Sequence, residues 1–185
     1  RQEKEKNSEK KVVNSFDHVV TVSKNMTDEL TAKYPNSNTK FHTIPNGFDK
    51  DDILKKPYLN KDDEKIRLIF SGNLYDNAEK YFNLFMKWLE SLKSIDYEMF
   101  NNIEINFFGV HHCPEITLKN IHFKGVVPNE VINKQIQTAD ACLLFLTDDI
   151  NYSFSTKFCE YISYEKPIIV FSNDGYTSKF IEQNN

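Results

Sequence analysis

The sequence has 185 residues, of which 39% are hydrophobic and 27% charged, a balance that suits a globular domain and excludes a disordered or fibrous chain. The formal net charge is −4 and charges of both signs alternate, so the sequence lacks the broad basic face that nucleic-acid binding needs. The three cysteines form no Cys-x-x-Cys pair, and no apolar run reaches the roughly 20 residues of a membrane span. We therefore expect a cytoplasmic protein, with at most a peripheral contact with the inner face of the membrane.

The first 63 residues predict a short strand-helix-strand segment followed by a connector. Residues 1–11 are a mixed-charge run, expected to be a frayed helix on the surface. A β-branched run at 18–23, a helical pattern at 24–34 and a second strand at 40–44 follow. The sequence Pro45-Asn46-Gly47 then marks a sharp turn, and the charged residues 49–65 are expected to connect two domains.

From residue 64 onward, strands and helices alternate. Apolar strands are predicted at 66–70, 103–108, 121–123, 141–146 and 167–171. The helix after the first of these has the clearest pattern, because its apolar residues fall on one face: Ala78, Tyr81, Phe82, Phe85, Trp88, Leu89 and Leu92. Further helices are predicted at 129–138, at 156–164 and from about residue 176. Strands that are apolar on both faces and alternate with helices indicate an α/β fold, a Rossmann-like parallel sheet with helices on both faces.

In open parallel sheets, ligands bind outside the carboxyl ends of the strands. The first candidate site is the loop after the 66–70 strand, where Gly72 and Asn73 precede a helix. A small residue there lets a ligand approach the backbone, and the helix start favours a phosphate. The alternative is a tight turn that binds nothing.

The second candidate site is the start of the helix at 156–164. The hydroxyl groups of Ser155 and Thr156 can cap that helix, while Lys157 adds a full positive charge for a diphosphate. Glu160, one turn later, can accept hydrogen bonds from the two hydroxyl groups of a ribose. The alternative is a surface pair of Lys157 and Glu160 worth a few tenths of a kcal/mol.

Several passages, in order along the chain, resemble the retaining GT-B glycosyltransferases of the group 1 or family 4 type. Residues 16–23 and 44–49 resemble the passages "D-x-v-x-x-v-S" and "I-P-N-G-v-D" at the junction of their domains. Residues 69–74, 123–127 and 139–144 resemble the first strand, the loop beside the base and a later strand of their donor domain. Residues 155–161 and 166–170 resemble "p-x-K-l-x-E-y" and "K-P-v-v".

The resemblance implies that the chain is one half of a GT-B architecture, cut from a longer protein. Residues 1–63 would be the end of the acceptor-side domain with the connector, and residues 64–185 the donor domain, truncated at its C-terminus. The substrates would be a UDP- or GDP-sugar and a saccharide or lipid-linked acceptor held by the missing half. No metal or other cofactor is implied, since positive side chains and helix amides stabilise the departing diphosphate.

The resemblance also assigns roles to residues of the donor site. Glu160 would be the second Glu of a Glu-x7-Glu motif and would bond the ribose, and the base would lie beside Val126 and Val127. The phosphates would meet Gly72, Asn73, Ser155, Thr156 and Lys157.

The sequence departs from the family pattern at three places, so no catalytic residue is assigned. Tyr152 stands where the first Glu is expected, and Asn73 stands where many members have Arg. Lys80 is a candidate to replace a lysine that the family has nearer to the strand. The alternatives are a GT-B epimerase, a degenerate transferase that binds without turnover, and a non-catalytic Rossmann-like module.

Other chemistries fit less well. The adjacent residues His111, His112 and Cys113 point in different directions on a loop, and no second Cys/His cluster completes a tetrahedral zinc site. No Ser or Cys stands in a recognisable nucleophile elbow, so we do not expect a hydrolytic triad.

Overall fold

A computed structural model describes residues 2–50, 64–74, 78–110, 116, 118–148 and 153–184 of the chain. The described residues divide into two compact units. The first contains the residues up to Asn46 together with Ser153 and Phe154, and the second contains the others from Gly47 onward. The expected roles of 1–63 and 64–185 remain predictions.

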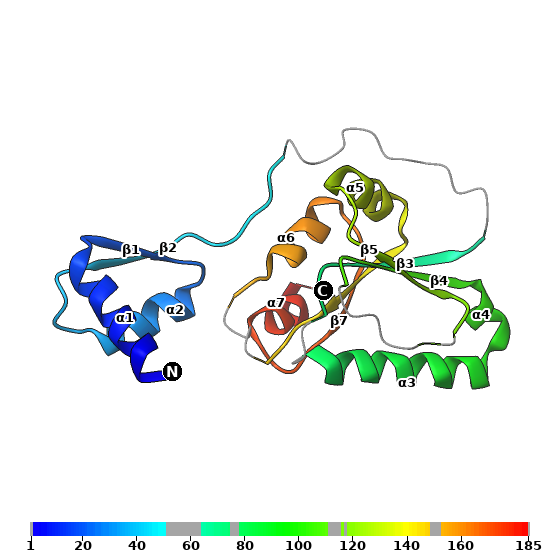
Figure 1. Cartoon of the computed structure of the whole chain (residues 1–185), viewed down its shortest axis with the longest axis horizontal. Helices are drawn as coiled ribbons and strands as arrows, with labels where there is room; N and C mark the ends of the chain where they lie inside the picture. Colours follow the sequence, from blue (N-terminus) through cyan, green and yellow to red (C-terminus); the bar gives the residue numbers. More distant parts are fainter. Residues whose placement is uncertain are drawn as a thin grey trace. The chain divides into compact units, whose positions relative to one another are not determined.

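The first unit is a small α/β segment (Figure 1). Helix α1 (Gln2–Ser15) precedes strand β1 (His18–Thr21), helix α2 (Lys24–Lys33) and strand β2 (Lys40–Thr43). The two strands pair in parallel, with His18 opposite Lys40. The buried Thr39 hydroxyl donates to the backbone carbonyls of Val13 and Phe16. This hydroxyl therefore fixes the end of α1 against the start of β2.

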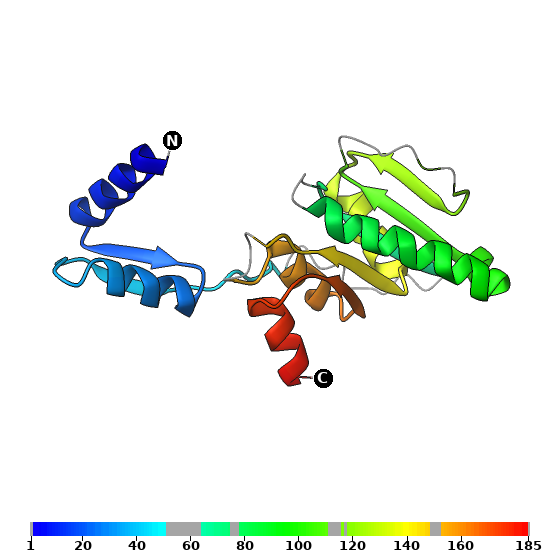
Figure 2. The same ribbon diagram turned by 90° about the horizontal axis from the view of Figure 1, so that it is seen from below.

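The second unit is built on a five-stranded parallel sheet (Figures 1 and 2). Its strands are β3 (Ile66–Ser71), β4 (Ile103–Phe108), β5 (Ile121–Gly125), β6 (Ala141–Phe145) and β7 (Ile168–Phe171). They lie in the order β5-β4-β3-β6-β7, and each strand pairs in parallel with its neighbours. The central strands are buried, which explains their continuous apolar runs.

Helices cover both faces of this sheet. Helix α3 (Glu79–Ile95) and the short α4 (Tyr97–Asn102) lie on one face, and α5 (Asn129–Thr138) and α6 (Thr156–Ser163) lie on the other (Figure 1). Helix α7 (Tyr176–Asn184) contacts α6 through an edge-to-face pair of Phe158 and Phe180. Among the residues described, no helix is both long and apolar enough to cross a membrane.

The core between α3 and the sheet consists largely of phenylalanine rings. Phe70, Phe107 and Phe145 project from three neighbouring strands, and their ring centroids lie 5.4 to 6.4 Å apart. Phe82 and Phe85 of α3 meet these rings edge to face. Buried aromatic groups of this kind contribute the large apolar area that stabilises a domain. The apolar face of the helix predicted from sequence is therefore the face that packs on the sheet.

The α/β class, the parallel sheet and the helices on both faces, all predicted from sequence, are confirmed. The prediction missed α4, which begins where the side chain of Asp96 accepts a hydrogen bond from the Met99 N–H (2.9 Å). An Asp at this position is a start signal for a helix, but six residues are too few to show a helical period.

Candidate functional site

The carboxyl ends of β3 and β6 meet where the order of the strands reverses. From β3 the chain goes to β4 on one side, whereas β6 lies on the other side of β3. Such a switch point leaves a crevice outside the sheet, because the connections leave in opposite directions. Gly72 and Asn73 directly follow β3, and Thr147 and Asp148 follow shortly after β6. The first candidate site predicted from sequence therefore lies at this switch point.

Two glycines, Gly72 and Gly109, allow close backbone packing at the carboxyl ends of β3 and β4. Gly72 has φ +133° and donates its N–H to the carbonyl of Phe108 (2.8 Å). Gly109, at the end of β4, has φ +78°, and a Cβ there would lie 3.3 Å from the backbone of Gly72. Both positions need backbone angles that L side chains rarely adopt, and both let backbone approach backbone.

The side chain of Lys157 lies directly on Gly72. A Cβ added to Gly72 would be 1.9 Å from Cε and 2.3 Å from Nζ of Lys157. Burial lowers the pKa of the Lys157 ammonium, and the nearby carboxylate of Glu160 opposes that shift. The chain thus holds a partly desolvated positive charge against the carboxyl end of β3.

Two hydrogen bonds position α6, the helix that carries Lys157. The Ser155 hydroxyl caps the helix by accepting from the Phe158 N–H (3.1 Å). The hydroxyl of the fully buried Tyr161 accepts from the N–H of Ser71 (3.0 Å), which ties α6 to the end of β3. Burial raises the pKa of Tyr161, so its hydroxyl stays neutral at physiological pH.

Glu160 and Thr156 face a second part of the site, a cavity of about 270 Å³. Gly47, Phe48 and Asp49 line one part of it. Side chains from α5 and α6 line the remainder: Asn129, Asn133, Thr156, Glu160, Ser163 and Tyr164. Small-molecule sites typically measure about 300–1,000 Å³, so this cavity is just below that range and would take only part of a nucleotide sugar.

The structure brings some of the predicted site residues together and leaves others apart. Gly72 and Lys157 are in direct proximity, and Thr156 and Glu160 share the cavity. Ser155 uses its hydroxyl as the helix cap, and Asn73 is half-buried beside Gly72. Val126 is 72% exposed, and neither it nor Val127 lines the Glu160 cavity. Tyr152, at the position of the first Glu, lies outside the described residues.

Sequence reasoning missed Asn129 and Asn133 of α5, which line the cavity opposite Glu160. Their spacing of four residues places them on one face of a helix. That spacing is the only signal in the sequence, and it does not by itself distinguish a cavity wall from a solvated face.

Lys80 takes part in a polar cluster at the ends of β6 and β7 rather than in a bond to the β3 loop. Its ammonium pairs with the carboxylate of Asp148, which also accepts from the Tyr81 hydroxyl (2.5 Å) and the Asn173 amide (3.0 Å). The hydrogen bond from Lys80 is the main reason why the pKa of Asp148 is lowered. The charge of Lys80 is therefore largely balanced by Asp148.

No group of three or more His, Cys, Asp or Glu residues that could hold a metal occurs among the described residues. The sequence His111-His112-Cys113 lies outside them. His18 and His42 of the first unit share one hydrogen bond between Nδ1 and Nε2 (2.8 Å).

Comparison with known proteins gives one family match and two structural similarities. Residues 1–52 match the model of Glycosyltransferase Family 4. The structure resembles that of TarM, with a TM-score of 0.64 and 14% identity over 96% of this chain and 34% of that chain. It also resembles sucrose-phosphate synthase from Thermosynechococcus elongatus, with a TM-score of 0.64 and 15% identity over 95% of this chain and 45% of that one.

No curated protein matches the chain by sequence. The chain covers 34% of the TarM chain and 45% of the sucrose-phosphate synthase chain, so it spans less than half of the length of either structure. Its fold is that of the GT-B glycosyltransferases, and the family match at residues 1–52 supports the same class of protein.

Proposed function

We propose that this chain is the donor-binding part of a glycosyltransferase, which binds a UDP- or GDP-sugar at the carboxyl edge of its five-stranded sheet. The observation that carries the proposal is the position of Lys157 on Gly72, beside a cavity that contains Glu160. A cation at a strand end and a carboxylate one helical turn away match the two ends of a nucleoside diphosphate. Glycosyl transfer, with retention, would go to a saccharide or lipid-linked acceptor bound outside this chain.

The phosphates would lie at the switch point. The start of α6 is the positive end of that helix's dipole, and together with the ammonium of Lys157 it favours an anion. Because Gly72 has no side chain, Lys157 can lie against it and hold its ammonium at the end of β3. Stabilisation of the departing diphosphate by these groups would replace a metal ion in the mechanism.

The ribose would occupy the Glu160 cavity. A carboxylate can accept hydrogen bonds from both ribose hydroxyl groups, which no lysine or arginine could do. The amides of Asn129 and Asn133 offer donors and acceptors in the same cavity. The base would lie toward the start of α5, near Val126 and Val127.

Titration calorimetry with UDP and GDP tests this proposal. We expect heat of binding for at least one of them, and Glu160→Gln should weaken that binding roughly 10–100-fold, the equivalent of one charge-assisted hydrogen bond. Glu98→Gln, on the helix of the opposite face, is the matched control and should leave the affinity unchanged. No binding of either nucleotide at millimolar concentration would favour the non-catalytic Rossmann-like module instead.

A further inference from the structure

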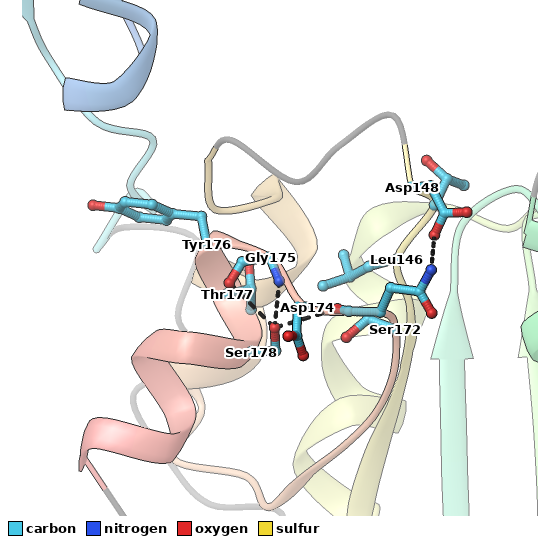
Figure 3. A pocket seen from close by; sticks show the side chains of 10 residues that line it. Leu146, Asp148, Ser172, Asp174, Gly175, Tyr176, Thr177 and Ser178 are labelled. Carbon is cyan, nitrogen blue, oxygen red and sulfur yellow. Dashed lines mark hydrogen bonds between the residues drawn. The ribbon is translucent and has the colours of Figure 1, made fainter. Parts of the chain in front are cut away.

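A second cavity, of about 110 Å³, lies at the carboxyl ends of β6 and β7, and the function proposed above does not use it (Figure 3). It is lined by Thr147 and Asp148 after β6, by residues 172–175 after β7, and by the first turn of α7. The side chain of Tyr176 points away from the others in Figure 3, whereas Leu146 lies among the polar side chains, so the lining is part polar and part apolar. At about 30 Å³ for each water in the liquid, the cavity takes three or four water-sized groups. It is too small for a nucleoside.

Thr147 is the feature that points to a ligand. It is only 5% exposed, and its hydroxyl oxygen is buried without a hydrogen-bond partner in the described part of the chain. Buried hydroxyl groups in native proteins are almost always bonded, so an orphan that lines a cavity indicates a group that binds there.

The charges around the cavity limit the chemistry of that group. The start of α7 is the positive end of that helix's dipole, whereas Asp174 presents a carboxylate acceptor. Asp148 is already bonded by Lys80, Tyr81 and Asn173. An anion would be repelled by Asp174, and a cation would meet the positive end of the helix. A neutral group that both donates and accepts satisfies both sides, and the hydroxyl group is the commonest group with that property.

The cavity lies at the same carboxyl edge of the sheet as the proposed phosphate site, so a sugar attached to the phosphate could enter it. Strand β6 is the immediate neighbour of β3, and the cavity opens at the carboxyl end of β6, the end where Lys157 meets Gly72 on β3. Neighbouring strands are about 4.8 Å apart, so a cavity at β6 and β7 is one to two strand spacings from β3, which is within the span of a sugar linked to a phosphate there. We infer that this cavity binds hydroxyl groups of the donor's sugar, with Thr147 as a specificity-determining residue; the inference rests on the proposed function.

The test is calorimetry on the full chain with UDP and GDP against UDP-glucose, UDP-N-acetylglucosamine and GDP-mannose. We expect at least one sugar nucleotide to bind more tightly than its bare diphosphate. Thr147→Val should lower the affinity for that sugar nucleotide about three- to tenfold and leave the affinity for the bare diphosphate unchanged. Thr147→Ser keeps the hydroxyl and should retain the affinity. Thr138→Val, at the far end of α5, is the control for the loss of a threonine hydroxyl.

The stability of the ligand-free variant separates binding from a structural role. Because the Thr147 hydroxyl has no partner among the residues that the structure describes, Thr147→Val should leave the melting temperature unchanged or raise it. A marked fall would assign the hydroxyl to the fold and overturn the inference.

Two outcomes distinguish this inference from the function on which it rests. If the bare diphosphates bind but the sugar adds nothing, or Thr147→Val weakens both ligands equally, the sugar site is wrong and the proposed function stands. If neither diphosphate binds, both proposals fail.

Discussion

Gly72 and Lys157 depend on each other at the end of β3, because the lysine side chain occupies the space that any Cβ would need. Gly72→Ala should cost about 1–3 kcal/mol of unfolding free energy from its positive φ alone. The methyl group should also displace Lys157 and abolish nucleotide binding. Gly125→Ala is the control, since Gly125 has φ +66° but nothing within 4 Å of its Cβ position. Gly125→Ala should lose a similar amount of stability without displacing Lys157, which denaturation would measure, and calorimetry on Gly72→Ala would measure the loss of nucleotide binding.

Lys157 is predicted to weaken the fold while it strengthens ligand binding. Its folded pKa lies below that of the unfolded chain because burial disfavours the ammonium. Between those two pKa values the unfolded state binds more protons, so stability rises with pH up to the ordinary lysine pKa of 10.5. At pH 7 the full penalty is present.

The variant Lys157→Met should therefore be more stable than wild type at pH 7, and that advantage should shrink as the pH approaches 10.5. Its affinity for UDP or GDP should fall roughly 10–100-fold. Denaturant unfolding of both proteins from pH 7 to 10 measures the difference. A Lys157→Met variant that is less stable at pH 7 would contradict the assignment of Lys157 as a desolvated cation.

At the scale of elements, α6 owes its position to the bond between Tyr161 and the N–H of Ser71. Tyr161→Phe leaves that N–H buried without a partner, which should cost about 1–3 kcal/mol of unfolding free energy. Tyr97→Phe is the control, because Tyr97 is 62% exposed at the start of α4. Equal losses for the two variants would show that the bond does not hold α6 in place.

Most of these elements could be predicted from the sequence, because periodicity and burial give the same signal. The stripe of Tyr81, Phe82, Phe85 and Leu89 predicts α3 and its buried face together. The contacts of the site could not be predicted in this way. That Lys157 reaches Gly72, or that Asn133 faces the Glu160 cavity, depends on distances between elements that no local pattern encodes.

At the scale of the whole molecule, the two units differ greatly in the size of their cores. Val13 is the one large hydrophobic residue of the first unit that is buried among the described residues, whereas the second unit buries more than twenty hydrophobic side chains. A unit with so small a core and a two-stranded sheet is marginally stable. We therefore expect the first unit to unfold at a lower denaturant concentration than the second.

The single tryptophan makes that difference measurable. Trp88 stacks on Phe85 in α3, so its fluorescence reports only the second unit. Far-UV circular dichroism reports both units, since α1 and α2 contribute to it. The two unfolding curves should not coincide, and the dichroism curve should begin to fall first. Coincident curves would show that the chain unfolds as one cooperative unit.

The central claim is that a nucleoside diphosphate binds where β3 ends, and a crystal structure of the chain grown with UDP or GDP tests it most directly. The proposed function predicts density for the diphosphate against Gly72 and the start of α6, with the ammonium of Lys157 within hydrogen-bond distance and the ribose on the carboxylate of Glu160. Density for the nucleotide elsewhere, with Lys157 still seated on Gly72, would contradict the claim.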